Sequence, residues 1–247
     1  MTGAARVIRS FQSVDSTNER ALALAAAGAP DGSVIVAAEQ TAGRGRRGRA
    51  WHSPEGGLYL SYVVRDVDAI EKPALLTLAA GVAAVRAIGE TTGLRADLKW
   101  PNDVVTADPP RKIAGILAEA SGAGSRIEFA VVGVGVNVST VSFPPEVATR
   151  ASSLAVELGR EIDRDALQAA LIAALDREVA RLRARGHEAL IRDWSEASPS
   201  ARGRRVSWVS QDGVLTGLTA GIDDRGALLV TTPHGPERLV AGEVIWA

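Results

Sequence analysis

Cysteine is absent from this sequence of 247 residues. Its absence excludes disulfide bonds and cysteine–zinc sites, and it excludes any reaction that holds a substrate as a thioester on the protein. An excess of either charge is also lacking, because the net charge is −1. The overall balance therefore gives no reason to expect nucleic acid or an anionic membrane as a partner.

Long hydrophobic runs and an export signal are missing as well. No apolar run reaches the length expected of a membrane span, and the N-terminus lacks the pattern of a signal peptide. The apolar fraction, 46%, is nevertheless enough to bury a core in one large or two unequal domains. The sequence therefore predicts a cytoplasmic enzyme or binding protein.

Lysine is scarce: Lys72, Lys99 and Lys112 are the only lysines among 28 basic residues. Lys99 ends one predicted strand, and Lys112 stands where another enters an apolar run. A lysine buried in a strand is costly unless an anion meets it. We therefore expect the side chain of Lys112 to lie at the mouth of a sheet, facing an anionic ligand.

Polar residues follow Lys99 in the segment Lys99-Trp100-Pro101-Asn102-Asp103. Asn102 and Asp103 directly after a strand could hold Mg²⁺ or a ribose, because Mg²⁺ prefers few carboxylates together with substrate phosphates. The alternative is a plain turn after proline, which needs no ligand. The pattern alone leaves both interpretations open.

What the sequence does have is an arginine–glycine segment, residues 43–49, with four arginines and three glycines. Glycine weakens helices and strands but allows backbone to approach a ligand closely, and arginine forks match phosphate or carboxylate. The segment predicts a flexible cover over an anionic ligand. A solvated basic loop or an RNA-binding segment is the alternative. Its single, internal position and the following Trp51 favour the ligand cover.

Hydrophobic periodicity predicts an α+β fold in two parts, residues 1–197 and 198–247. The first part alternates strands and helices in a mixed sheet, and the second reads as a small SH3-like β-barrel after a linker at 195–203. We expect the barrel to contact a partner or to support the site. The predicted strands are 6–14, 34–36, 57–65, 94–100, 104–106, 111–117, 127–138, 204–209, 214–222, 227–232 and 238–246. The predicted helices are 15–28, 73–90, 163–185 and 187–194.

Two shorter patterns bear on the site. Ser16 and Glu19 have the spacing of a capping box, so Ser16 and Thr17 either cap a helix or bind the polar head of a small ligand. Gly133 and Gly135 interrupt a buried strand where a ligand could approach the backbone. They lack the following helix and third glycine of a dinucleotide-binding fingerprint, which excludes a Rossmann fold.

Five motifs in this order together resemble the signature of the biotin protein ligases: residues 16–18, 39–49, 99–103, 111–117 and 133–137. The similarity covers nearly the whole chain. It implies the biotin–lipoate ligase catalytic fold, like that of class II synthetases, with a C-terminal SH3-like β-barrel. Because the chain starts at the first catalytic strand, the resemblance implies a ligase without a DNA-binding helix-turn-helix domain.

The resemblance also implies the reaction and its partners. Biotin attacks the α-phosphorus of ATP to give biotinyl-5′-adenylate, and a lysine of a biotin carboxyl carrier domain then takes the biotin. ATP and biotin are substrates, Mg²⁺ assists, and the partner belongs to an acyl-CoA carboxylase. No nucleic acid and no membrane are expected, and the oligomeric state implied is a monomer or weak dimer.

Residue roles follow from the same resemblance. The catalytic residues implied are Lys112, Arg46 and Arg44, and Asp103 is the implied metal ligand. The adenine-covering loop maps to about residues 139–154. The implied biotin-binding residues are Ser16, Thr17, Asn18, Gln40, Gly43, Arg44, Gly45, Arg46, Trp51, Lys112, Gly115 and Gly133. The implied ATP-binding residues are Arg46, Arg49, Trp51, Lys99, Asn102 and Asn137.

Two alternatives stand beside this interpretation. Lipoate ligases and octanoyl transferases share the fold and perform related chemistry, although the arginine–glycine segment resembles that of the biotin enzymes. An RNA-binding module that uses the same arginines belongs to a different class. Binding of biotin against lipoate, and the salt dependence of RNA affinity, distinguish the three.

Overall fold

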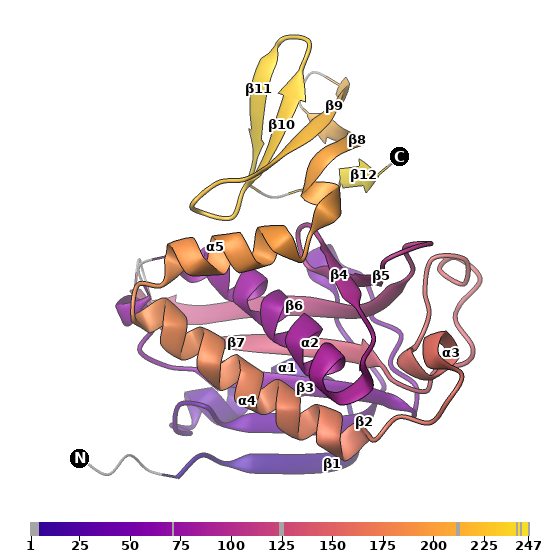
Figure 1. The fold of residues 1–247 in the computed structure, drawn as a ribbon. Coiled ribbons are helices and arrows are strands. Elements are labelled where there is room, and N and C mark those ends of the chain that lie inside the picture. Colours follow the sequence, from indigo (N-terminus) through magenta and orange to yellow (C-terminus); the bar gives the residue numbers. More distant parts are fainter. Residues whose placement is uncertain are drawn as a thin grey trace.

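The structure is a computed structural model and describes residues 5–70, 72–123, 126–210, 213–240, 242 and 244–246. Figure 1 shows a large sheet with helices packed on it and, beyond helix α5, a small sheet made by the last part of the chain. The large sheet has seven strands and the small sheet has five. The predicted α+β architecture is confirmed.

The large sheet has the strand order β1-β2-β3-β7-β6-β5-β4. β1 and β2 are parallel, and the other neighbouring pairs are antiparallel. Each strand coincides with a predicted segment, although β6 is longer than expected. The strands are β1 (Ile8–Val14), β2 (Val34–Gln40), β3 (Gly57–Val64), β4 (Ala96–Lys99), β5 (Asp103–Thr106), β6 (Lys112–Ala123) and β7 (Arg126–Asn137).

Helices cover both faces of this sheet unequally. α2, α4 and α5 lie on one face, whereas α1 alone lies on the other (Figure 1). The short helix α3 was not predicted. The α-helices are α1 (Thr17–Ala26), α2 (Leu76–Thr92), α3 (Leu154–Leu158), α4 (Arg164–Arg183) and α5 (His187–Glu196), and 3-10 turns occur at η1 (Arg46–Gly48), η2 (Val67–Ala69), η3 (Pro73–Leu75) and η4 (Pro199–Ala201).

Side chains of β7 alternate between the two faces, as the period of a strand requires. Val132 and Val134 join the large core under α2, whereas Val131 joins the smaller core under α1. Gly133 and Gly135 continue the face of Val131 past the N-terminal end of α1, where Asn18 packs on Gly133. This glycine-lined part of the sheet is where the cavity described below is found.

Residues 73–92 form one helical stretch that is long and apolar enough, by length and composition, to cross a membrane. The expectation that no apolar run reaches that length is therefore wrong. The stretch nevertheless belongs to the core: 61% of its most apolar window is buried inside the protein. α2 packs on the sheet and on α4, so burial against neighbouring elements accounts for its composition.

The two predicted helix caps differ in outcome. Asp163 caps α4 as expected, because its Oδ1 accepts hydrogen bonds from the backbone N–H groups of Asp165 and Ala166 at 3.1 and 2.9 Å. Ser16 is the N-cap residue of α1 but makes no side-chain cap bond. Glu19 contacts Arg44 in place of the helix N-terminus, so the capping box predicted there does not form.

The small sheet is antiparallel in the order β11-β10-β9-β8-β12. The predicted strand 238–246 is divided between β11 and β12, and residues 241 and 243 lie outside the described part. Among the described residues β11 and β12 do not pair, so closure into a barrel stays a prediction. The strands are β8 (Arg202–Ser210), β9 (Gly213–Ile222), β10 (Leu228–Thr232), β11 (Gly235–Leu239) and β12 (Val244–Trp246).

The segment predicted as a linker, 195–203, is ordered and attached to the large sheet. α5 extends to Glu196, and the hydroxyl of Ser198 donates to the carbonyl of Leu98 at 2.7 Å. A second attachment joins the small sheet to the large one: the indole N–H of Trp100 donates to the Gly226 carbonyl at 2.9 Å. The boundary between 197 and 198 remains a prediction, but the chain there is not a loose tether.

Arg86 of α2 joins three helices. Its guanidinium contacts Glu178 of α4 and Asp193 of α5, the latter at 2.5 Å. Glu178 is 1% exposed, and Arg181 lies 3.4 Å from its carboxylate. Burial raises the pKa of Glu178, while Arg181 and Arg86 lower it.

We predict that Arg86→Met lowers the free energy of unfolding by about 2–4 kcal/mol at neutral pH, because a buried carboxylate loses one of its cations. The folded pKa of Glu178 is raised, so the folded protein takes up a proton first as pH falls. The loss should therefore shrink as the pH falls below neutral, measured by urea unfolding. Arg177→Met, which removes an exposed pair with Glu90, is the control and should cost under about 0.5 kcal/mol. A loss independent of pH would contradict the prediction.

Candidate functional site

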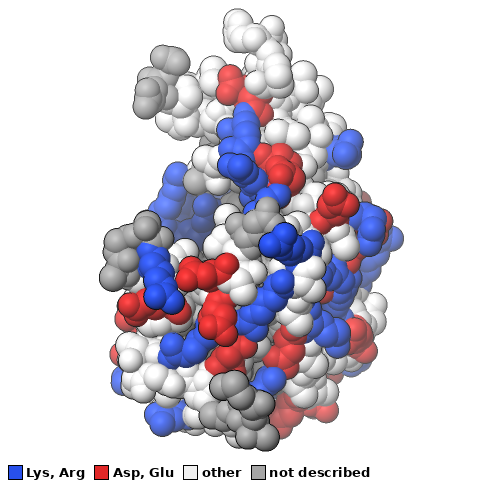
Figure 2. All heavy atoms as spheres, turned by 90° about the vertical axis from the view of Figure 1, so that its left-hand side faces the viewer, with Lys and Arg blue, Asp and Glu red and all other residues white. Residues whose placement is uncertain are grey.

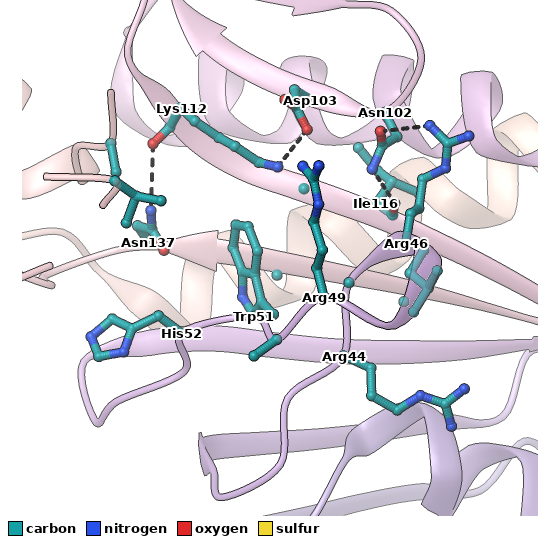
Figure 3. A pocket seen from close by; sticks show the side chains of 18 of the residues that line it. Arg44, Arg46, Arg49, Trp51, His52, Asn102, Asp103, Lys112, Ile116 and Asn137 are labelled. Atoms are coloured by element: carbon teal, nitrogen blue, oxygen red, sulfur yellow. Dashed lines mark hydrogen bonds and ion pairs between the residues drawn. The ribbon is translucent and has the colours of Figure 1, made fainter. Parts of the chain in front are cut away.

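A cavity of about 670 Å³ opens beside the start of α1 on the face of the large sheet that this helix covers only in part (Figure 3). Its volume suits a ligand of cofactor size. The wall combines the start of α1, the arginine–glycine segment, the middle of β6 and β7, the segment 99–103 and part of 143–151. β12 of the small sheet also contributes. The structure thus brings together the five motifs that lie far apart in the sequence.

One end of the cavity is a neutral polar floor. Thr17 and Asn18 are each 4% exposed, and both line the cavity with Ser16 and Gln40. Gln40 Oε1 accepts from the backbone N–H and the hydroxyl of Thr17 at 2.8 and 3.0 Å. Ser61 lies between Thr17 and Asn18, at 2.8 Å from the former's hydroxyl and 2.6 Å from the latter's Oδ1. Sequence reasoning missed Ser61, and its signal was a small polar residue within an apolar strand.

This floor is short of hydrogen atoms. Asn18 Nδ2 faces the Leu117 carbonyl and the Glu119 carboxylate, and Gln40 Oε1 faces a backbone N–H, so both amides have a fixed orientation. Three oxygen–oxygen contacts then join Gln40, Thr17, Ser61 and Asn18, and each needs a hydroxyl hydrogen. Thr17 and Ser61 supply one hydrogen each. The floor therefore favours a ligand head that donates N–H groups.

The arginine–glycine segment forms a short hairpin neck with an irregular tip. Gly45 N–H donates to the Arg49 carbonyl at 2.7 Å, and Trp51 N–H donates to the Gly43 carbonyl at 2.9 Å. At the tip, Arg47 and Gly48 adopt left-handed φ values of 58° and 72°. The segment is therefore a folded loop that lines the cavity, and its expected flexibility stays a prediction.

The arginines of this loop point in different directions (Figure 3). Arg49 extends toward Lys112 and Asp103, and Arg46 extends toward Asn102, whose Oδ1 accepts from Arg46 Nη1 at 3.2 Å. Arg44 turns away from Lys112. Its guanidinium contacts Glu19 and lies 2.5 Å from Glu119.

Lys112 stands at the opposite end of the cavity from the polar floor. Its ammonium lies 2.5 Å from Asp103 Oδ1 and 5.0 Å from the centre of the Trp51 ring. Asn102 is held against β6, because its Nδ2 donates to the Ile116 carbonyl at 2.8 Å. Asn102 and Asp103 therefore belong to the site as well as to a turn, so the two interpretations of the sequence are compatible.

The cations at this end are incompletely neutralised. Burial lowers the pKa of the Arg46 guanidinium below its usual value, and the nearby charge of Arg47 lowers it further. Burial also lowers the pKa of Lys99, against the opposing effect of Asp103. Both pKa shifts have the same cause: each cation loses hydration on burial, and nearby anions do not fully compensate for that loss. This end of the cavity favours a polyanionic ligand.

Trp51 lies against two glycines of the sheet. A Cβ atom at Gly135 would lie 2.5 Å from Trp51 Nε1, and one at Gly115 would lie 3.1 Å from Trp51 Cζ3. A Cβ atom at Gly133 would collide with Asn18. Gly115 and Gly133 were expected to admit a ligand, and the structure shows that they first make room for side chains of the cavity wall. The indole N–H of Trp51 is buried and has no hydrogen-bond partner among the described residues.

Asn137 fixes the segment that follows β7. It is 3% exposed, and its Nδ2 donates to the carbonyls of Ser152 and Lys112 at 3.0 and 3.5 Å. Lys112 N–H donates to the Arg150 carbonyl at 2.7 Å, so the segment 143–151 lies along the start of β6. Asn137 thus positions both Lys112 and the loop expected to cover adenine.

The small sheet supplies part of the wall. Gly242, Val244 and Trp246 line the cavity, and the ammonium of Lys99 lies 5.6 Å from the centre of the Trp246 ring. Sequence reasoning placed no site residue here, and the alternation of residues 238–246 carries no signal for one. The expectation that this part supports the site is confirmed by the contact.

No cluster of three or more His, Asp or Glu side chains with the spacing of a metal site occurs among the described residues. Asp103 therefore offers one carboxylate, which suits an ion held mainly by ligand phosphates.

Comparisons with known proteins agree with this geometry. The family described as "Biotin/lipoate A/B protein ligase family" matches residues 10–137, and "Biotin protein ligase C terminal domain" matches residues 203–246. The chain is 35% identical to the biotin–[acetyl-CoA-carboxylase] ligase of Paracoccus denitrificans, covering 94% of this chain and 97% of that protein. It is 33% identical to the bifunctional ligase/repressor BirA of Bacillus subtilis, covering 94% of this chain and 71% of that protein.

Solved structures give the same result. The biotin protein ligase of Aquifex aeolicus in complex with biotin and ATP superimposes with a TM-score of 0.85 at 29% identity, covering 98% of this chain and 99% of that chain.

We predict that Gly135→Ala lowers the free energy of unfolding by about 1–3 kcal/mol, because the added methyl group displaces the Trp51 ring. Gly89→Ala is the control, since a methyl group there meets only the Leu94 carbonyl at 3.9 Å and improves helix α2 by up to about 1 kcal/mol. Adding Trp51→Leu to Gly135→Ala should cost less than the sum of the two single changes. Additive losses in denaturant titrations would show that the ring and the glycine are not in conflict.

Proposed function

The chain belongs to the biotin protein ligases of the biotin/lipoate A/B protein ligase family, and we propose how its cavity carries out their ATP-dependent reaction. The observation that carries the proposal is the polarity of the cavity. A neutral floor that is short of hydrogens lies at one end, and incompletely neutralised cations lie at the other. Biotin has a ureido head that donates N–H groups and a carboxylate at the end of its tail.

Biotin binds with its ureido ring on Ser16, Thr17, Asn18 and Gln40. Its N–H groups donate to oxygens of the floor that the hydroxyl hydrogens of Thr17 and Ser61 cannot all satisfy. The tail then runs past Trp51, and the carboxylate reaches Lys112. The two ends of the cavity thus fix the direction of the substrate before ATP enters.

ATP occupies the cationic end. Its α-phosphate lies between Lys112 and Arg46, and its outer phosphates extend toward Arg49, Lys99 and Asn102. The adenine lies near Asn137 and the segment 139–154. Mg²⁺ held by the phosphates and Asp103 would supply further neutralisation of the phosphate charge.

Lys112 is shared between protein and substrate. Asp103 holds its ammonium at 2.5 Å in the structure, and the substrate carboxylate and α-phosphate replace or join that carboxylate. A carboxylate oxygen of biotin attacks the α-phosphorus, the bond to pyrophosphate breaks, and biotinyl-5′-adenylate forms. Lys112 and Arg46 stabilise the negative charge that crowds between the two reacting anions.

The second step needs no nucleophile from the protein. The neutral ε-amine of a carrier lysine attacks the acyl carbon, the bond from that carbon to the AMP oxygen breaks, and the amine loses its proton to solvent. Relatives named biotin–[acetyl-CoA-carboxylase] ligase point to a biotin carboxyl carrier domain of a carboxylase as the partner. We place the protein in the cytoplasm as a monomer or weak dimer.

Lipoate is the rival substrate within the family. Its dithiolane ring is apolar and donates no hydrogen bonds, so it would leave the floor of Thr17, Asn18 and Gln40 unsatisfied. RNA binding by the loop is the rival from another class. Arg46 contacts Asn102 of the cavity wall, and Arg44 is held by two carboxylates. The face in Figure 2, on the side of the N-terminus and away from the loop, interleaves both charge signs.

The test of the proposal is exchange of labelled pyrophosphate into ATP. We expect exchange to depend on biotin and not on lipoate. Exchange driven by lipoate would assign the other substrate. RNA affinity that falls steeply with salt, without any exchange, would overturn the enzymatic proposal.

Lys112→Ala should lower biotin-dependent pyrophosphate exchange by roughly 10²–10³-fold, the scale for losing one donor to a charged transition state. The protein should remain folded, because Lys112 lies at the rim of the sheet and not in its core. Lys72→Ala, which removes a lysine paired with Asp224 outside the cavity, is the matched control and should exchange normally. Near-normal exchange by Lys112→Ala would reduce Lys112 to a structural residue.

Arg46→Gly should still form biotinyl-5′-adenylate but release it. A charge-assisted contact to phosphate is typically worth ~1.5–3 kcal/mol, and its loss acts mainly on the dissociation rate. The measurement is labelling of an unrelated lysine-rich protein in the presence of ATP and biotin. If the variant exchanges pyrophosphate yet labels the bystander no more than the wild type does, Arg46 does not hold the intermediate.

A further inference from the structure

A continuous series of polar contacts connects the two stems of the arginine–glycine loop through the floor of the cavity. We call it the floor–loop relay. Its members, in spatial order, are Arg44, Glu119, Asn18, Ser61, Thr17, Gln40, Ser53 and the carbonyl of Trp51.

The first half of the relay depends on Glu119 of β6. Its Oε1 lies 2.5 Å from Arg44 Nη2, and its Oε2 accepts from Asn18 Nδ2 at 2.8 Å. The two oxygens of one carboxylate therefore hold the first stem of the loop and a residue of the floor. The Glu119 side chain is 21% exposed and the Arg44 side chain 41%, so the contact with Asn18 is better shielded from water than the contact with Arg44.

The second half reaches the other stem through Gln40. Its Nε2 donates to Ser53 Oγ at 2.9 Å, and Ser53 Oγ donates to the Trp51 carbonyl at 3.0 Å. Gly43 packs directly on this arrangement, since a Cβ atom there would lie 2.6 Å from the Trp51 carbonyl oxygen. The stem cannot shift without disturbing the hydrogen bonds of the floor.

We propose that Glu119 is a positioning residue that couples occupancy of the floor to closure of the loop. The inference rests on the proposed function, because the ligand that fills the floor is taken to be biotin. A ligand that donates to the floor fixes Asn18, and Asn18 then fixes the carboxylate that receives Arg44. The coupling is reciprocal: a loop held by Glu119 also retains the ligand.

A second carboxylate on the same guanidinium provides an internal comparison. Glu19 of α1 also contacts Arg44, but its side chain is 49% exposed, and it makes no contact with Asn18 in the relay. An exposed ion pair contributes little. Glu119 and Glu19 therefore differ in their connection to the floor while they share the same partner.

The experiment measures amide hydrogen exchange in residues 43–51, with and without biotin, and the KM for biotin and kcat of pyrophosphate exchange. In the wild type, biotin should slow amide hydrogen exchange in residues 43–51. Glu119→Gln should lower this protection at least about 10-fold and raise KM more than it lowers kcat. Glu119→Asp should recover part of it. Glu19→Gln should change the protection and the KM less than about 3-fold each. Glu128→Gln, on the exposed part of β7, should change neither the protection nor the KM.

Combined variants separate coupling from general damage. If Glu119 acts through Arg44, then Arg44→Gln, Glu119→Gln and the double variant should all lose the same protection. Arg44 lies on the surface, so Arg44→Gln reports on the coupling even if Glu119→Gln fails to fold. Losses that add, or biotin-dependent protection that survives in both single variants, would overturn the proposal. Absence of biotin-dependent pyrophosphate exchange in the wild type would instead refute the proposed function.

Discussion

The contact between the Lys112 ammonium and the Asp103 carboxylate, at 2.5 Å, is the interaction on which the rest of the site depends. Asp103 is the carboxylate set among several cations that have lost part of their water, as the lowered pKa values of Arg46 and Lys99 report. The described cavity wall has two acidic residues, Asp103 and Glu146, against seven lysines and arginines. The cavity is therefore a site for anions before any substrate arrives, and a polyphosphate together with a tail carboxylate completes it. Favourable packing elsewhere in the sheet has to offset the repulsion among these cations.

The missing side chains of three glycines decide where the cavity lies. Strand periodicity and register place Gly115, Gly133 and Gly135 on the face of the sheet that carries α1, beside the start of that helix. Each stands where a Cβ atom would meet Trp51 or Asn18 too closely. The glycines thus let Trp51 and Asn18 pack directly on the sheet, where both side chains line the cavity. This arrangement explains why glycine interrupts β7 although it weakens a strand.

The sequence predicted the strands and helices of the large sheet well, because alternation in strands and the apolar stripe of α4 are local patterns that burial enforces. The loop was predicted from the composition of residues 43–49, Lys112 from its place where a strand begins, and the other ATP-side residues from the family resemblance. Local patterns could not predict which arginines face the ligand, since Arg44 and Arg46 are two residues apart and differ only in their long-range partners, Glu119 and Asn102. The failed capping box has the same cause: Glu19 contacts Arg44 instead of the helix N-terminus. Side-chain partners distant in sequence leave no mark on local periodicity.

The small sheet shows this limit most clearly. Its strands were predicted, yet its contribution to the cavity was not. Trp246 packs over Lys99, and the neighbouring Trp100 donates to the Gly226 carbonyl, so the segment 99–103 is held between the two sheets. Lys99, Asn102 and Asp103 are the residues that meet the phosphates in the proposed reaction. Their positions are consequently set by both parts of the chain. A boundary at 197–198 marks a change in architecture, but the phosphate end of the site lies across it, and neither sheet alone builds that end.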